Sequence, residues 1–273
     1  MNQRTDGEHG EHAGFSVVTY NVLAQAYVRR DRYPRSPEHA LEAGARRRRL
    51  LDRIADLDAD ILCLQEVEPD AHAAIAERLG DAYVALYEGK RGRPDGASVL
   101  VRRARFRVRS SRALHYEARE RGDDQLALIV DCEDLVSGRA LTIACTHLRW
   151  QGREVPEAEH LGRLQLLELL ALRPADATWI IAGDLNALSQ SVVLEAALMR
   201  GFVLSCRAQR PWDTVNIGGR RRKLDYLLIP PQSLSPRPCS LPRLERDTPM
   251  PSRDEPSDHL PLRVEYRWRA DAR

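Results

Sequence analysis

The segment Trp179-Ile180-Ile181-Ala182-Gly183-Asp184-Leu185-Asn186 is a short apolar run that ends in polar residues able to hold a metal ion or a phosphate. Further segments end in the same way, at residues 17–21, 61–66, 141–147, 223–226 and 256–259. Polar strand ends drawn from both halves of a chain are typical of a fold that gathers one site along one edge of its sheets. Their carboxylates, asparagines and histidines suit a hard divalent cation and phosphate chemistry.

The composition is that of a folded, almost neutral protein. A length of 273 residues allows one large α/β domain or two small ones, and a hydrophobic content of 43% supplies a core. The formal net charge of +2 excludes a protein that binds polyanions through bulk charge. The basic charge is almost entirely arginine, with Lys90 and Lys223 as the only lysines. Phosphate binding by arginine therefore has to come from local clusters.

The five cysteines are scattered and form no C-x-x-C pair, which argues against a disulfide scaffold and for a reducing compartment. The N-terminal segment, residues 1–14, is polar and lacks the apolar core of a signal peptide. No apolar run reaches the length of a membrane span. We therefore expect a cytoplasmic protein with no membrane contact and no obligate protein partner.

Hydrophobic periodicity predicts many short strands and few helices. The expected strands are 15–22, 61–65, 83–87, 97–101, 126–132, 141–145, 179–182, 224–229 and 262–268, and the expected helices are 41–57, 71–79, 157–172 and 192–199. Residues 230–256 are rich in proline, serine and arginine and are expected to form a surface loop. In the helix 41–57 we expect the arginines 46–49 to lie on a solvated face.

This mixture of hairpins and crossovers predicts an α/β fold of two packed sheets with helices outside. The polar strand ends come from both ends of the chain, so we expect a single catalytic domain over residues 15–268. Residues 1–14 are expected to be a disordered tail, and 269–273 a C-terminal tail.

Asp184 and Asn186 form the strongest local signal. In an extended strand their spacing of two places both side chains on one face, and Gly183 before them permits a close backbone approach or an unusual turn. A carboxylate can orient water or bind a metal, and an asparagine amide can donate to a phosphate oxygen without adding charge. The alternative is an ordinary turn made by these side chains after a strand.

Asp258-His259 is the second signal, because histidine exchanges protons near neutral pH. Asp225, on another predicted strand, is the candidate carboxylate that orients and stabilises the His259 ring. Asp258 points away from His259 in an extended segment and is free to face a metal or water. His147, at another strand end, could hold a phosphate oxygen as a cation. A satisfied structural histidine is the alternative for each ring.

Glu66 and Asn21 also end apolar runs, and either one alone is compatible with an ordinary strand end. Eight such residues at comparable strand ends are hard to explain as independent turns. Phosphodiester hydrolysis needs a metal that neutralises the phosphate, a group that activates water, and donors for the charge that builds on the oxygens. The set supplies each of these.

A basic, glycine-rich loop at residues 89–96 carries Lys90, Arg91 and Arg93 and is a candidate for contact with substrate. The arginines 220–222, followed by Lys223, are a second candidate for binding additional phosphates. Trp150 or Trp212 could stack on a nucleobase, although a role in the core or at its rim is equally compatible with either residue.

In these motifs the sequence resembles the endonuclease/exonuclease/phosphatase superfamily, and the resemblance covers about residues 15–266, nearly the whole chain. The matching motifs are Tyr20-Asn21-Val22-Leu23, Leu64-Gln65-Glu66-Val67, Thr146-His147-Leu148, Gly183-Asp184-Leu185-Asn186, Leu224-Asp225-Tyr226 and Ser257-Asp258-His259-Leu260, in the order of the family. The resemblance implies a four-layer α/β sandwich of two mixed sheets flanked by helices.

The resemblance also implies a role for each strand-end residue. Glu66 would be the main ligand of Mg²⁺ or Mn²⁺, with Asn21 beside it and Asp258 nearby. Asp184 would position the attacking water. Asn186 and His147 would contact the scissile phosphate, and Asp225 would pair with His259. His259 would act either as a base or as a cation that stabilises the phosphate.

Within the superfamily, residues 19–24 and 95–98 look most like the deadenylase, nocturnin and Angel branch. That likeness implies a metal-dependent phosphoesterase that attacks directly with water and acts on RNA 3′ ends, including 2′,3′-cyclic phosphates, or on small nucleotides. One alternative is a phosphoinositide or lipid-headgroup phosphatase, and another is a DNA nuclease, although Leu23 stands where abasic-site endonucleases have a second acid. A non-catalytic binding module on the same fold is the alternative from another class.

Overall fold

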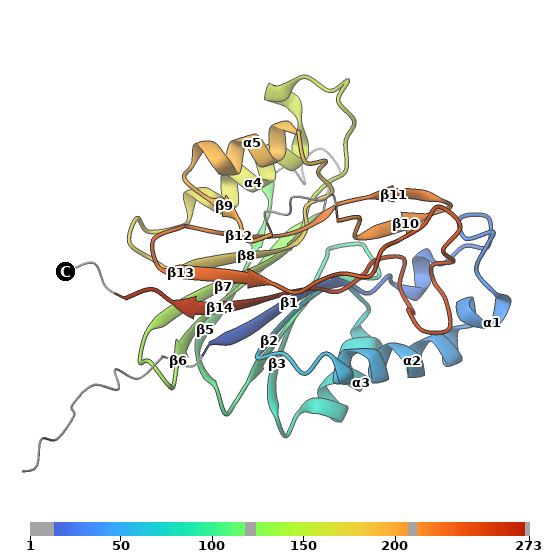
Figure 1. Cartoon of the computed structure of the whole chain (residues 1–273), viewed down its shortest axis with the longest axis horizontal. Coiled ribbons are helices and arrows are strands. Elements are labelled where there is room, and N and C mark those ends of the chain that lie inside the picture. Colours follow the sequence, from blue (N-terminus) through green and yellow to red (C-terminus); the bar gives the residue numbers. More distant parts are fainter. Residues whose placement is uncertain (1–13, 118–123, 207–211, 271–273) are drawn as a thin grey trace, which may run out of the picture.

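The structure is a computed structural model that describes residues 14–117, 124–206 and 212–270 (Figure 1). Two six-stranded mixed sheets pack face to face, and helices cover their outer faces. The predicted four-layer α/β sandwich is therefore confirmed. Residues 1–13 and 271–273 of the two expected tails lie outside the described residues.

The first sheet joins the two ends of the chain. Its strand order is β13 (Leu234–Pro238), β14 (Leu262–Trp268), β1 (Phe15–Asn21), β2 (Ile61–Val67), β4 (Gly96–Arg102) and β3 (Tyr83–Gly89). β1 pairs antiparallel with β14 and parallel with β2. The segment that carries His259 therefore leads directly into a strand beside the one that carries Asn21.

The second sheet contains the strands of the central half of the chain. Its order is β5 (Phe106–His115), β6 (Leu126–Asp134), β7 (Ala140–His147), β8 (Trp179–Asp184), β12 (Asp225–Ile229) and β9 (Val203–Leu204). A separate hairpin of β10 (Val215–Ile217) and β11 (Arg220–Arg222) lies above the sheets in the view of Figure 1.

The helices form the two outer layers. They are η1 (Gln25–Tyr27), α1 (Glu38–Leu41), α2 (Ala43–Asp56), α3 (Pro69–Leu79), η3 (Glu157–Glu159), α4 (Leu161–Ala171) and α5 (Val192–Met199). Residues of α2 and α3 pack on the first sheet, and residues of α4 and α5 pack on the second. Within the described residues, every helix is too short or too polar to span a membrane.

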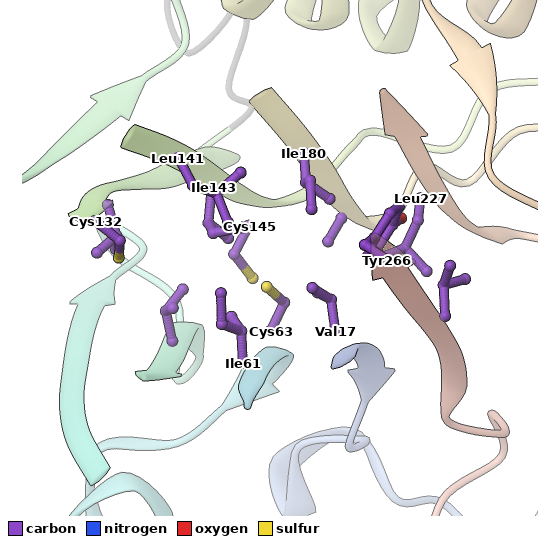
Figure 2. Packing of buried hydrophobic residues seen from close by; sticks show 14 of the residues in the cluster. Val17, Ile61, Cys63, Cys132, Leu141, Ile143, Cys145, Ile180, Leu227 and Tyr266 are labelled. Carbon is purple, nitrogen blue, oxygen red and sulfur yellow. The ribbon is translucent and has the colours of Figure 1, made fainter. Parts of the chain in front are cut away.

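The continuous apolar runs follow from burial on both faces of each sheet. In β2, Ile61 and Cys63 face the second sheet, whereas Leu62 and Leu64 belong to the cluster beneath α2 and α3. Figure 2 shows Cys63 and Cys145 pointing toward each other between the sheets. Because successive side chains of a strand alternate between faces, a strand with helices on one side and a sheet on the other must be apolar throughout.

Several elements differ from the sequence-based expectation. β5 was not predicted, because its outward residues are mostly exposed and polar and its apolar positions are few. β13 lies within the predicted loop 230–256; it is an edge strand, where prolines are tolerated. The predicted helix 157–172 is divided into η3 and α4 at His160, which caps α4 by accepting from the Arg163 N–H.

Gly183 has the close backbone approach that the sequence predicted. It lies opposite Thr146 in the parallel pairing of β7 and β8. A Cβ at this position would lie 1.9 Å from the Thr146 carbonyl oxygen, a distance that real Cβ atoms do not adopt. A glycine here lets β7 and β8 stay paired up to the residues that follow, His147 and Asp184.

Asp134 is a buried carboxylate that ties β6 to the end of the chain. It accepts hydrogen bonds from Trp268 Nε1 at 2.6 Å, Arg105 Nη2 at 3.0 Å and Ser137 Oγ at 2.8 Å. Burial alone would raise the pKa of this carboxyl, but its donors outweigh burial and lower it from the ordinary value of 3.8.

We predict that Asp134→Asn lowers the free energy of unfolding by about 3 kcal/mol, because it removes the charge that Arg105 and Trp268 share. Since the folded-state pKa is lowered, the stabilisation is fully present above the ordinary value of 3.8 and is lost as the pH falls through the lowered one. Urea unfolding of both proteins between pH 7 and pH 2.5 checks this. A variant that matches the wild type at pH 7 would contradict it.

Candidate active site

The register of the second sheet places three functional side chains in one row. His147 at the end of β7 lies opposite Asp184 at the end of β8, and Asp184 lies opposite Asp225 at the start of β12. In the facing sheet, Asn21 at the end of β1 lies opposite Gln65, the residue before Glu66. The strand ends identified in the sequence therefore meet at one edge of the sandwich.

Unusual backbone conformations aim two of these side chains. Glu66 has φ of +56° and sits where the pairing of β2 and β4 shifts register between Gln65 and Val67. Asn186 has φ of +47°, and its N–H donates to Asp184 Oδ1 at 2.9 Å. Left-handed backbone in residues other than glycine is costly and concentrates at functional sites.

The structure corrects our reason for linking Asp184 to Asn186. β8 ends at Asp184, so the two residues are not alternate members of an extended strand. They are joined by the hydrogen-bonded turn that we considered as the alternative. That turn nevertheless brings both side chains to the same site, because Asn186 Nδ2 lies 2.9 Å from His147 Nε2.

Asp184 is the centre of the site. Its Oδ2 accepts from Asn21 Nδ2 at 3.1 Å and lies 3.6 Å from His147 Nε2 and 3.7 Å from His259 Nε2. The carboxylate is only 2% exposed. Burial, with a further contribution from the charge of Asp225, raises the pKa of Asp184 to about 7. Such a carboxyl can exchange a proton near neutral pH.

His259 is held by Asp225. The Nδ1 atom of its ring lies 2.8 Å from Asp225 Oδ2, and both residues are buried. Burial opposes the charged ring, but the charges of Asp225 and Asp184 outweigh it and raise the pKa of His259 well above its ordinary value. The sequence left open whether His259 is a base or a cation, and this environment favours the protonated, cationic ring.

His147 has the opposite protonation. Burial, together with the positive charges of Lys90 and His259, lowers the pKa of His147 well below its ordinary value. The amide nitrogen of Asn186 can only donate, so its contact with His147 Nε2 fits a neutral ring that accepts at Nε2. This environment argues against the cationic His147 that we considered, and its contact with the phosphate stays a prediction.

Glu66 and Asp258 provide the acidic side of the site. Glu66 Oε1 accepts from Asn21 Nδ2 at 2.9 Å, and Asp258 Oδ2 accepts from Tyr33 Oη at 2.9 Å. Burial and the charge of Asp258 raise the pKa of Glu66. A divalent cation between these carboxylates would offset the unfavourable charge of Glu66.

Asn21 contributes its nitrogen to this arrangement. Its Nδ2 donates to both Glu66 and Asp184, while its Oδ1 accepts from the Leu23 N–H at 3.0 Å. Asn21 therefore orients two carboxylates, and its role as a direct metal ligand stays a prediction. Asp184, Asp225 and His259 also place ligand atoms within 4.8 Å of one another, but Nδ1 of His259 is already hydrogen-bonded to Asp225.

A cavity of about 530 Å³ opens beside His147 and Asn186. Lys90 and Arg93 line it, as predicted for substrate-binding residues, whereas Arg91 is exposed and does not line it. Lys90 is buried, and its Nζ lies 2.6 Å from Asp95 Oδ2, which fixes its position.

Lys223 does not reach this cavity. Its Nζ donates to the Cys206 carbonyl at 3.2 Å and lies 5.1 Å from the centre of the Tyr226 ring. The two candidate tryptophans lie in different places. Trp212 packs against the core between the sheets, whereas Trp150 lines the cavity. The guanidinium of Arg222 lies 4.9 Å from the centre of the Trp150 ring.

The sequence reasoning missed Arg46, which it assigned to a solvated face. Arg46 is 3% exposed and donates to the carbonyls of Val22, Leu23 and Pro256 at 3.1, 2.7 and 3.1 Å. Through these hydrogen bonds Arg46 connects the segment after Asn21 to the segment before Asp258. A signal was present, because residues 46, 50 and 54 follow at intervals of four, and all three are buried in α2.

This geometry defines a hydrolase that acts on phosphoesters, with acidic groups for a divalent metal and a buried carboxylate and histidine for water and phosphate. The chain belongs to the Endonuclease/Exonuclease/phosphatase family, whose model matches residues 18–259. Enzymes of this family depend on divalent metals, and the carboxylates of Glu66 and Asp258 are suitable oxygen donors. The superfamily resemblance found in the sequence is therefore confirmed.

Comparison with known proteins also confirms the predicted branch. Nocturnin of Xenopus laevis is 28% identical over 98% of this chain and 76% of its own length. Carbon catabolite repressor protein 4 homolog 4 of Arabidopsis thaliana is 23% identical over 94% of this chain and 78% of its own length.

Solved structures share the fold. ANGEL2, described as a 2′,3′-cyclic phosphatase and solved with adenosine-2′,3′-vanadate, has a TM-score of 0.80 at 21% identity, covering 93% of this chain and 96% of its own. The human nocturnin catalytic domain has a TM-score of 0.74 at 24% identity, covering 95% of each chain.

We predict that Arg46→Met weakens divalent-cation binding at least tenfold, because three carbonyls that hold the loops of Asn21 and Asp258 lose their donor. Titration calorimetry with Mn²⁺ measures this. Arg46→Lys should restore part of the affinity, and Arg48→Met, on the exposed face of the same helix, should not change it. A destabilised Arg46→Met protein that keeps wild-type affinity would show that Arg46 only supports the fold.

Proposed function

We propose that this chain is a Mg²⁺- or Mn²⁺-dependent phosphoesterase that hydrolyses RNA 3′ ends, including 2′,3′-cyclic phosphates, or small nucleotides. The observation that carries the proposal is the position of Asp184, a buried carboxylate whose Oδ2 lies within 4 Å of Asn21, His147 and His259. Direct attack by water needs one group that orients the water and others that stabilise the phosphate, and this cluster can supply both.

In the proposed reaction, Asp184 orients a water molecule and accepts one of its protons. Its raised pKa makes the carboxylate basic enough to do so near neutral pH. The water oxygen bonds to phosphorus, the bond to the leaving oxygen breaks, and that oxygen takes up a proton, which balances the proton that Asp184 accepted. No residue of the chain becomes bonded to phosphorus.

His259 and Asn186 stabilise the phosphate in this proposal. A cationic His259, held by Asp225, offers Nε2–H to a phosphate oxygen. Asn186 Nδ2 has His147 Nε2 and the Leu148 carbonyl as its present partners, and a phosphate oxygen could replace the former. Neutral His147 then acts by positioning Asn186 and accepting its hydrogen bond.

The metal belongs to the acidic side of the site. Glu66 and Asp258 would hold Mg²⁺ or Mn²⁺ with Asn21 beside them, because hard cations prefer oxygen ligands. When bound, the cation neutralises charge on the phosphate and lowers the cost of two buried carboxylates.

The substrate proposal rests on the relatives and on the cavity. ANGEL2 is described as a 2′,3′-cyclic phosphatase, and nocturnin of Xenopus laevis is 28% identical over 98% of this chain. The cavity beside Asn186 combines Lys90 and Arg93 with Trp150, which suits phosphate groups and a stacked nucleobase. We also propose a cytoplasmic location, which the five free cysteines support.

We predict that Asp184→Asn and His259→Gln each lower kcat at least a thousandfold while the protein stays folded, because each removes a group that acts on water or phosphate. Hydrolysis of a short RNA and circular dichroism measure the two effects. Wild-type kcat in either folded variant would refute the assignment.

A second prediction concerns the metal. Chelation with EDTA should abolish hydrolysis, and added Mg²⁺ or Mn²⁺ should restore it. Glu66→Gln should raise the Mn²⁺ concentration needed for half-maximal activity more than tenfold, because it removes the charge that attracts the cation. Activity that persists in EDTA would contradict the proposed metal dependence.

The substrate is tested on one panel: RNAs that end in 3′-OH, 3′-phosphate or 2′,3′-cyclic phosphate, single-stranded DNA, inositol phosphates and dinucleotide cofactors. We expect an RNA end or a small nucleotide to give the highest kcat/KM. A preference for inositol phosphates or DNA would favour the alternatives considered from the sequence.

A further inference from the structure

Four exposed arginines lie together beside the mouth of the active-site cavity. Arg32 lines the cavity itself. Arg35 follows it in the same loop, Arg220 starts β11, and Arg246 comes from the segment between β13 and β14. We call this group the arginine track. Its members come from three separate parts of the chain, so a run in the sequence does not explain their proximity.

Contacts with the hairpin of β10 and β11 hold the track together. A Cβ at Gly218 would lie 3.5 Å from the Arg32 carbonyl oxygen, and one at Gly219 would lie 3.0 Å from that of Arg246. Arg35 Nη1 donates to the same Arg246 carbonyl at 3.1 Å and lies directly against Gly219. The two glycines, with φ of +59° and +87°, make the tight tip that allows this approach.

The charges of the track are not neutralised by the protein. Among the residues that the structure describes, none of its arginines forms an ion pair with a carboxylate, and all four are exposed. Neighbouring arginines differ: Arg29 pairs with Asp31, and Arg243 pairs with Glu245. Asp31 and Glu245 thus have other partners, and the four arginines of the track keep their positive charge.

The hairpin links this charge to the catalytic centre. Val215 in β10 pairs with His259, and the Asn216 N–H donates to the Asp258 carbonyl at 3.1 Å. With a rise of about 3.3 Å per residue, the tip at Gly218 lies roughly 10 Å from the point where β10 meets His259. The hairpin therefore runs from beside His259 to the arginine track.

We propose that the arginine track binds backbone phosphates of an RNA chain 5′ to the scissile end. This rests on the proposed function and names its substrate class: an oligonucleotide rather than a free nucleotide. Guanidinium groups bind phosphodiester oxygens in pairs, and a row of them follows a backbone without reading its bases. A free dinucleotide is too short to occupy the track.

The test compares a 12-nucleotide RNA with a dinucleotide of the same 3′ end. In the triple variant Arg35→Gln, Arg220→Gln, Arg246→Gln, we expect KM for the 12-mer to rise at least tenfold and KM for the dinucleotide to change less than twofold. Each phosphate contact to a single strand contributes about 0.7 to the salt slope. The slope of log KM against log KCl for the 12-mer should therefore fall by about 2.

A matched control removes the same charge elsewhere. Arg48, Arg200 and Arg237 are exposed on other parts of the chain, and their triple glutamine variant should keep the wild-type KM for both substrates. An equal rise in KM for the 12-mer in the two triple variants would overturn the proposal, because it would reflect net charge alone.

Two further outcomes are decisive and distinguishable. If the wild type hydrolyses both substrates with the same KM, the track is wrong while the proposed function stands. If the wild type hydrolyses no RNA or dinucleotide with Mg²⁺ or Mn²⁺, the proposed function itself fails, and the track fails with it.

Discussion

The hydrogen bond from Asn21 to Asp184 joins the two sheets at the point where the chemistry is gathered. Asn21 ends β1 of one sheet, Asp184 ends β8 of the other, and each is almost fully buried. The position of Asp184 is fixed by its pairing opposite His147 on one side and Asp225 on the other. A register shift of one residue would turn these side chains to the opposite face. The site therefore depends on the packing of the whole sandwich.

The two buried histidines of the site, His147 and His259, prefer opposite protonation states because their charged neighbours differ. The charges of Asp225 and Asp184 outweigh burial at His259 and favour its cationic ring, whereas burial and the positive charges of Lys90 and His259 lower the pKa of His147 and favour its neutral ring. Burial also makes Asp184 basic and Glu66 reluctant to ionise. A buried set of acids and histidines can thus supply a proton acceptor, a cation and a metal site at once, because each group has a different neighbour.

The sequence predicted the sandwich and the strand ends that meet at the site. Buried strands appear as continuous apolar runs, and a polar residue at the end of such a run is easy to recognise. The sequence could not predict β5, whose outward residues are exposed and polar, or β13, whose prolines are tolerated only at an edge. It also misjudged the burial of Arg46, and it left out the neighbours that disfavour a cationic His147. The role of Arg46 depends on which carbonyls meet at its guanidinium, and the charge of His147 depends on Lys90 and His259, which are distant in sequence.

The central claim is that water held by Asp184 attacks phosphorus directly. The stereochemistry of hydrolysis tests it: an RNA whose last linkage is a phosphorothioate of one configuration is hydrolysed in H₂¹⁸O, and the configuration of the product is determined. A single displacement by water inverts the configuration at phosphorus and places one ¹⁸O in the product. Retention of configuration would require two displacements and a covalent intermediate, and it would contradict this account.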